Sequence, residues 1–176
     1  MLTLHLQLIQ MNKTILLALI LMVSQMAFAQ DTKKVNLYNP NENADSALAI
    51  IQAQAAKEGK HVLIQVGGNW CGWCIEFNRF VKSDAQLDSI VKANYLVYHL
   101  NYSKENENKK LLTQFEFPNR FGFPVWVILD SKGKRLHTQN SSYLEKDKSY
   151  NKEKVKGFLL DWNAEAIDSK KYNWIN

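Results

Sequence analysis

The sequence is poor in cysteine, proline and glycine. Of its 176 residues, 2 are cysteine, 3 are proline and 7 are glycine, whereas 46% are hydrophobic and 22% are charged. So little proline and glycine, with this share of apolar residues, is typical of an ordinary globular protein, and the length suits one domain.

No long segment of the chain carries charges of only one sign. The formal net charge is +5, and the basic residues are spread through "SKENENKK", "DSKGKR" and "EKDKSYNKEKVK", mostly with acidic residues between them. A surface that binds nucleic acid needs clustered basic residues. We therefore interpret these segments as solvated faces and predict no binding to nucleic acid.

No apolar run is long enough to cross a bilayer. The N-terminal run, residues 15–23, has about 9 residues, whereas a spanning helix needs about 20. It follows Lys13 and precedes the tripeptide "AFA". This pattern predicts a cleaved signal peptide over 1–29, with Met11 as an alternative start and an uncleaved anchor as the alternative. Export would place the protein in the periplasm or a similar compartment, where disulfides persist.

The rest of the chain predicts an extended lead-in over 30–43 and one domain over 44–176. The expected helices cover 44–59, 71–82, 84–94, 104–116 and 152–167, and the expected strands cover 61–66, 95–102, 124–130 and 135–139. Strands that alternate with helices call for parallel neighbours, whereas the last two strands read as a hairpin. The sequence therefore predicts an α/β fold with a central mixed sheet of four to five strands and helices on both faces.

Both cysteines lie in one segment, "VGGNWCGWCIEF", residues 66–77. A structural zinc site needs four ligands, and the histidines outside the signal segment, His61, His99 and His137, are isolated from one another. We therefore predict no metal. A purely structural disulfide is a second interpretation, but it would close a loop of a few residues, where the gain in chain entropy is smallest.

A reversible redox pair fits this segment better. Cys71 lies at a predicted helix N-terminus, where unpaired backbone N–H groups and the helix dipole stabilise a thiolate. Cys74 lies one turn later and is near enough to attack a mixed disulfide on Cys71. We expect Cys74 to be the more buried, resolving thiol.

The segment "VLIQVGGNWCGWCIEF" resembles the active-site segment of thioredoxin-like proteins, in which an apolar strand, a short break and a tryptophan precede Cys-x-x-Cys. The segments "LVYHLNY" and "RFGFPVWVILDSKGK" are similar to the strands that follow in that family. The resemblance covers roughly residues 45–165 and is strongest to exported members with a W-C-x-W-C motif. It implies a thioredoxin fold in which Pro124, preceded by Phe123, is cis and faces the disulfide.

The resemblance also implies an activity, that of a thiol–disulfide oxidoreductase acting on protein thiols and disulfides. Cys71 would be the nucleophile and Cys74 the resolving thiol. No cofactor is needed, because the disulfide carries the electrons. A membrane redox partner would exchange electrons with the protein. A monomer and a reductase are favoured over an isomerase, because no dimerisation region is visible.

The same resemblance suggests how a substrate would bind. A cis proline has no N–H, so the backbone at Phe123 and Pro124 is free to pair with an extended substrate strand. Trp70, Gly72 and Trp73 would shape the rim around the cysteines. The alternative for Trp70 is that it packs beneath the active-site helix, since large aromatic side chains are usually well buried.

Two positions depart from typical thioredoxins. Gln65 stands where those proteins carry a buried aspartate, and His99 stands where they carry a lysine. We hypothesise that His99 assists deprotonation of Cys74, since neutral imidazole is a competent base near pH 7. The alternative is a strand histidine without a role. Glu76 is a second candidate base, although we expect it to point to solvent.

Because of these two departures, a second class of protein remains an alternative to an oxidoreductase. A binding or chaperone-like module could keep the fold and use its disulfide only as a clip, and its thiol pKa would then be near the free value of about 8.5. A peroxidase of the same fold is disfavoured, because such peroxidases generally do not use a Cys-x-x-Cys pair on this helix. Residues 103–120 and the C-terminal tail match nothing in the family pattern and receive no function.

Overall fold

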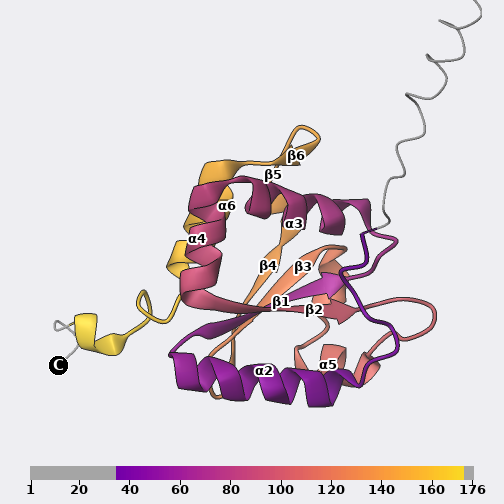
Figure 1. The fold of residues 1–176 in the computed structure, drawn as a ribbon, viewed down its shortest axis with the longest axis horizontal. Coiled ribbons are helices and arrows are strands. Elements are labelled where there is room, and N and C mark those ends of the chain that lie inside the picture. The colour runs from indigo at the N-terminus through magenta and orange to yellow at the C-terminus, as the bar shows by residue number, and fades with distance from the viewer. Residues whose placement is uncertain (1–34, 173–176) are drawn as a thin grey trace, which may run out of the picture. The chain divides into compact units, whose positions relative to one another are not determined.

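The computed structural model describes residues 35–172. The predicted signal peptide and the first residues of the lead-in lie outside this range. Within it, no helix combines the length and apolar character needed to cross a membrane. Helices and strands alternate along most of the chain (Figure 1).

A four-stranded mixed sheet forms the centre of the fold. The strands are β1 (His61–Gly67), β2 (Tyr95–Asn101), β3 (Val125–Leu129) and β4 (Arg135–Asn140), in the spatial order β2-β1-β3-β4. β1 runs parallel to β2 and antiparallel to β3, and β3 and β4 form an antiparallel hairpin. The predicted mixed sheet and its terminal hairpin are confirmed. Every residue of β1 is buried, because this interior strand is covered on both faces.

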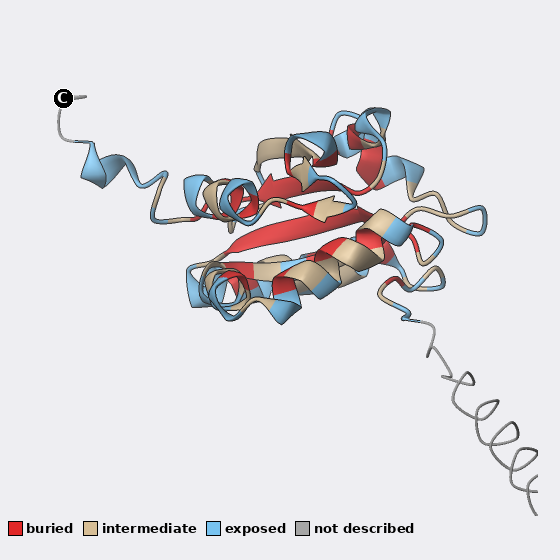
Figure 2. Cartoon of the chain, turned by 90° about the horizontal axis from the view of Figure 1, so that it is seen from above, coloured by how far each residue is buried: buried red, intermediate tan, exposed pale blue. Residues whose placement is uncertain are grey.

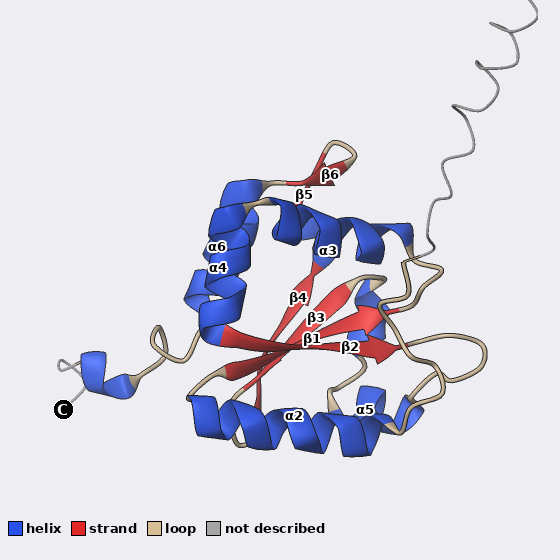
Figure 3. Ribbon diagram, in the orientation of Figure 1, coloured by secondary structure: helices blue, strands red, loops and turns tan. Residues whose placement is uncertain are grey.

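Helices cover both faces of this sheet, as Figures 2 and 3 show. One face carries α2 (Ala44–Glu58) and the short α5 (Lys109–Gln114). The other face carries α3 (Gly72–Ser83), α4 (Ala85–Asn94) and α6 (Lys152–Asp161). These two layers match the predicted arrangement.

Alternation along β1 divides its side chains between the two layers. Val62, Ile64 and Val66 pack with α2, whereas Leu63 packs with the α3 layer. Gln65 lies on the Leu63 face, two residues further along the strand. Because side chains two residues apart lie on the same face of a strand, the side chain of Gln65 points toward α3 and away from α2.

Capping residues mark both ends of α2 and the start of α4. The Asn43 side chain accepts a hydrogen bond from the Ser46 N–H at the start of α2, and Gly59 ends the helix with φ +64°. At the start of α4, the Asp84 carboxylate accepts hydrogen bonds from the Gln86 and Leu87 N–H groups.

Two predicted helices are too long. The helix predicted over 104–116 is formed only over Lys109–Gln114. The Asn108 side chain donates to the Asn101 carbonyl, and the Asn101 side chain donates to the Asn106 carbonyl, both at 2.8 Å. These bonds hold the preceding segment as a loop in competition with a helix. The last helix ends at Asp161, well before residue 167.

One element was not predicted. A small hairpin, β5 (Glu145–Lys146) and β6 (Ser149–Tyr150), turns through Asp147 with φ +56° and leads into α6. Single-turn 3-10 helices cover Pro118–Phe121, Ser141–Tyr143 and Ser169–Lys171. The hairpin matters for the site, because Tyr150 at its end is buried against α3.

Two adjacent leucines on α6 test this packing. Leu159 is fully buried between α6 and the sheet, whereas Leu160 is 38% exposed. We expect Leu159→Ala to lower the free energy of unfolding by about 2–5 kcal/mol, because it leaves a cavity in the core. Leu160→Ala should cost under about 1 kcal/mol. Urea unfolding of both variants is the measurement, and equal losses would contradict the packing of α6.

Candidate active site

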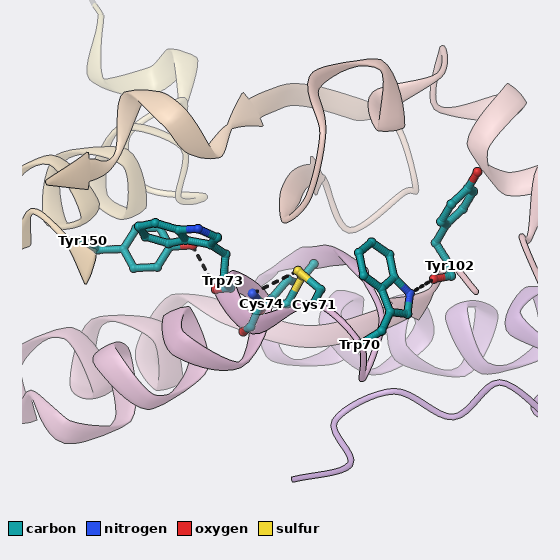
Figure 4. Close-up of a disulfide and its surroundings, with 7 residues drawn as sticks. Trp70, Cys71, Trp73, Cys74, Tyr102 and Tyr150 are labelled. Atoms are coloured by element: carbon teal, nitrogen blue, oxygen red, sulfur yellow. Dashed lines mark hydrogen bonds between the residues drawn. A yellow bond between two sulfur atoms is a disulfide. The ribbon is translucent and has the colours of Figure 1, made fainter. Parts of the chain in front are cut away.

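The two cysteines form a disulfide in the turn that joins β1 to α3. The turn closes through a hydrogen bond from the Cys71 N–H to the Gly68 carbonyl at 3.0 Å. The Cα atoms of Cys71 and Cys74 are 5.2 Å apart. Cys71 is the N-cap of α3, and its sulfur accepts a hydrogen bond from the Cys74 N–H at 3.1 Å (Figure 4).

The surroundings of the two sulfurs differ. Cys74 is fully buried, whereas Cys71 is 4% exposed at the end of the helix. The first turn of α3 carries no acidic residue, so no carboxylate of that turn weakens the positive end of the helix dipole. Together, the backbone N–H and the dipole favour a thiolate at Cys71 once the disulfide is reduced.

Two tryptophans flank the disulfide on opposite sides (Figure 4). Trp70 is 58% exposed, and its indole N–H donates to the Tyr102 carbonyl at 2.7 Å. It does not pack beneath the helix, so that alternative is wrong. Trp73 is half-buried and meets Tyr150 edge to face, with ring centroids 5.5 Å apart. The Tyr150 hydroxyl donates to the Trp73 carbonyl at 3.0 Å.

The loop before β3 forms another wall of the site. The Phe123–Pro124 peptide bond is cis. Phe123 packs against the disulfide cluster, stacks on Tyr102 at 4.8 Å between ring centroids, and meets Trp70 edge to face. Pro124 is buried and Gly72 is exposed. Trp70, Tyr102 and Phe123 therefore form one continuous aromatic surface beside Cys71.

The two departures from typical thioredoxins lie side by side. Gln65 and His99 are paired in register across β1 and β2. The Gln65 side chain donates to the Cys74 carbonyl at 2.9 Å. Both residues line a pocket of about 180 Å³ between the sheet and the helices α3 and α4. Burial, with a smaller effect from Lys82, lowers the pKa of His99 to about 4, so His99 is neutral at pH 7.

Glu76 does not simply point to solvent as expected. Its carboxylate accepts two hydrogen bonds from Arg79 and another from the Ser149 hydroxyl, and the side chain is 22% exposed. Hydrogen bonds from Arg79 keep the pKa of Glu76 below its usual value, more than burial raises it. Ser149 belongs to the unpredicted hairpin, so the hairpin contacts this carboxylate. Glu76 is thus bound to Arg79 and Ser149.

Four residues of the site were not predicted from the sequence: Tyr102 and Tyr150, described above, and Tyr38 and Asn69. Tyr38, in the segment taken as a lead-in, is 3% exposed and packs against both cysteines. Asn69 holds it there, accepting from the Leu37 and Tyr38 N–H groups at 2.9 and 3.1 Å and donating to the Tyr38 carbonyl at 2.8 Å. The signal was present in "NLY", an apolar pair in an otherwise polar segment.

Comparison with known proteins gives the family and the fold. Residues 48–151 match the thioredoxin-like domain family. The thiol:disulfide interchange protein DsbD of Yersinia pestis (strain Pestoides F) is 28% identical over 134 residues, which cover 73% of this chain and 22% of that protein. The crystal structure of a disulphide isomerase from Xylella fastidiosa Temecula1 is similar with a TM-score of 0.64 and 18% identity, over 72% of this chain and 96% of that one. The second similarity shows the fold alone.

The site is a Cys-x-x-Cys disulfide at a helix N-terminus, carried by a thioredoxin fold. The chain belongs to the thioredoxin-like domain family, whose match extends over more than half of it. It spans only 22% of the length of its DsbD relatives, so it corresponds to one part of those proteins.

Two glycines test the packing around the disulfide. A Cβ atom added at Gly67 would lie 2.4 Å from the Cys74 sulfur, whereas one added at Gly72 would meet nothing within 4 Å. We expect Gly67→Ala to lower the free energy of unfolding of the disulfide form by about 1–3 kcal/mol through overpacking. Gly72→Ala should be neutral or stabilising. Thermal unfolding of both variants is the measurement. A Gly67→Ala variant as stable as the wild type would contradict the close approach of the Cys74 sulfur to Gly67.

The half-buried His99 predicts a pH dependence of stability. Its pKa is about 4 in the folded protein and about 6.5 in an unfolded chain. As pH falls from about 6.5 to about 4, the unfolded chain takes up a proton that the folded protein does not, so stability falls. We expect His99→Gln to lose less stability than the wild type over this range. Urea unfolding at several pH values tests this, and identical pH profiles would contradict it.

Proposed function

We propose that this protein is a thiol–disulfide oxidoreductase of the cell envelope that reduces disulfides in other proteins. The observation that carries the proposal is the unequal surroundings of Cys71 and Cys74 at the N-terminus of α3. Cys71 lies beside an open aromatic rim and has a backbone N–H on its sulfur. Cys74 is enclosed.

The chemistry needs only the two sulfurs. In the reduced protein, the Cys71 thiolate attacks one sulfur of a substrate disulfide, the substrate S–S bond breaks, and the other substrate sulfur leaves and takes up a proton. The Cys74 thiolate then attacks Cys71 in the mixed disulfide, and the second substrate sulfur leaves. Two electrons pass to the substrate, and the disulfide seen in the structure is the product.

The rim supplies a binding surface for an extended peptide. Pro124 has no N–H, which leaves the backbone at Phe123 available to pair with a substrate strand. Trp70 and Trp73 lie on either side of the disulfide, where they would contact the residues flanking a substrate cysteine (Figure 4). Exposed Gly72 leaves room for the substrate backbone near Cys71.

We further propose that His99 assists deprotonation of Cys74, with Gln65 in a supporting role. His99 is neutral at pH 7, as an acceptor must be, and Gln65, its neighbour across the two strands, donates to the Cys74 carbonyl. Gln65 cannot titrate, so its part is to hold the backbone of Cys74. An unchanged pH–rate profile for reduction by His99→Gln would contradict this role of His99.

We also propose a direction of electron flow and a location. We assign the protein as a monomeric reductase exported by residues 1–29 and supplied with electrons by a membrane partner. The similarity to proteins named thiol:disulfide interchange protein supports an exchange with other protein thiols. A reductase needs a low reduction potential, near that of thioredoxin at about −270 mV.

Serine variants of the two cysteines separate their roles. Cys74→Ser should accumulate a mixed disulfide with a disulfide-bonded peptide, because the resolving thiol is missing. Cys71→Ser should form little or none, because Cys74 is buried. Non-reducing electrophoresis and mass spectrometry measure the adducts. Equal trapping by the two variants would contradict the assigned roles.

The reduction potential of the wild type decides between the candidate activities. Titration against dithiothreitol or glutathione buffers, followed by tryptophan fluorescence, gives the midpoint. A value near or below about −250 mV supports a reductase, and one above about −180 mV indicates an oxidase or isomerase. A pair that does not interconvert would favour a binding module with a structural disulfide.

A further inference from the structure

The hydroxyl of Tyr38 is buried without a hydrogen-bond partner among residues 35–172. Tyr38 is 3% exposed, so water does not readily compensate for this. A buried polar group left unpaired is costly, and native structures contain few of them. This hydroxyl therefore calls for a partner that the disulfide form does not supply.

The position of the hydroxyl identifies that partner. A Cβ atom added at Gly67 would lie 2.8 Å from the Tyr38 hydroxyl oxygen and 2.4 Å from the Cys74 sulfur. Both atoms thus lie on the same side of Gly67, at the end of β1. A disulfide sulfur is a poor acceptor, but a thiolate is an anion and accepts strongly.

Tyr38 is suited to donate at any ordinary pH. Burial raises its pKa well above the usual value, and the Gln65 side chain beside the hydroxyl opposes this in part. Its backbone is fixed by the three hydrogen bonds with Asn69, which itself lies two residues before Cys71. The donor is thereby tied to the loop that carries the disulfide.

Gln65 is the other polar side chain beside Cys74, and its amide group already has a hydrogen-bond partner. Gln65 donates to the Cys74 carbonyl, and so acts on its backbone. His99 contacts the ring of Tyr38 edge to face at 5.4 Å between centroids. Tyr38 thus lies in contact with both the cysteine cluster and His99, although it precedes the 48–151 segment that matches the family.

We infer that the Tyr38 hydroxyl donates a hydrogen bond to the Cys74 sulfur when the disulfide opens, and so stabilises Cys74 as a leaving thiolate. This inference rests on the proposed function and adds a residue to its site. It also explains the unpaired hydroxyl, which would gain its partner only in the reduced protein.

The step can be written for a small dithiol such as dithiothreitol. One dithiothreitol thiolate attacks the Cys71 sulfur, the Cys71–Cys74 bond breaks, and its electron pair goes to the Cys74 sulfur beside Tyr38. The second dithiothreitol sulfur then attacks the first, forming a cyclic disulfide and releasing Cys71. The two protons of the dithiol end on the two cysteine sulfurs.

The test is Tyr38→Phe, which removes the hydroxyl and keeps the ring. The matched control is Tyr95→Phe, which removes a buried hydroxyl bonded to the Leu159 carbonyl beside α6. We expect the rate constant for reduction by dithiothreitol to fall about tenfold in Tyr38→Phe, because a hydrogen bond to an anion is lost. Tyr95→Phe should reduce at the wild-type rate.

A second measurement excludes a merely structural role. Urea unfolding is compared for the disulfide form and for protein reduced with excess phosphine. Tyr38→Phe should leave the disulfide form as stable as the wild type or more so, and destabilise the reduced form. Tyr95→Phe should affect both forms equally, because its hydrogen bond does not involve the disulfide.

The outcomes separate this inference from the proposed function. A wild-type reduction rate for Tyr38→Phe, with equal effects on both redox forms, would overturn the role of Tyr38 and leave the oxidoreductase proposal standing. Failure to trap a mixed disulfide on Cys71 would count against the proposed function. The dithiothreitol rates would still decide the role of Tyr38, because they involve only the protein's own disulfide.

Discussion

The close contact between the Cys74 sulfur and the backbone of Gly67 is the constraint on which the site depends. It joins the end of the central strand β1 to the first turn of α3, with no room for a side chain between them. With the strand buried on both faces, the start of the helix cannot shift. Cys71 is therefore held at the N-cap, where the backbone and the helix dipole act on its sulfur.

The site is asymmetric because different parts of the chain enclose its two sides. Trp70, Tyr102 and Phe123 form an aromatic surface beside Cys71 that a partner can reach. On the other side, Tyr38 and Gln65 enclose Cys74. Cys71 thus lies beside an exposed aromatic surface and Cys74 is enclosed, an asymmetry that suits the proposed exchange.

Most of the fold could be predicted from the sequence, because its signals are local. The strand at 61–66, the glycine that ends α2 and the aspartate cap of α4 each depend on residues close in the chain. The order of these elements then restricts the sheet to a mixed arrangement. The predictions failed where side chains compete with helical hydrogen bonds, as Asn106 and Asn108 do before α5.

The sequence by itself determined the redox pair, the strand and helix that carry it, and the family pattern around it. Only the tertiary structure decided what surrounds the sulfurs. Asn69 and Tyr38 are 31 residues apart, and Tyr150 is 77 residues from the carbonyl it binds at Trp73. No local pattern encodes such contacts, because they form only when burial of the sheet brings distant segments together.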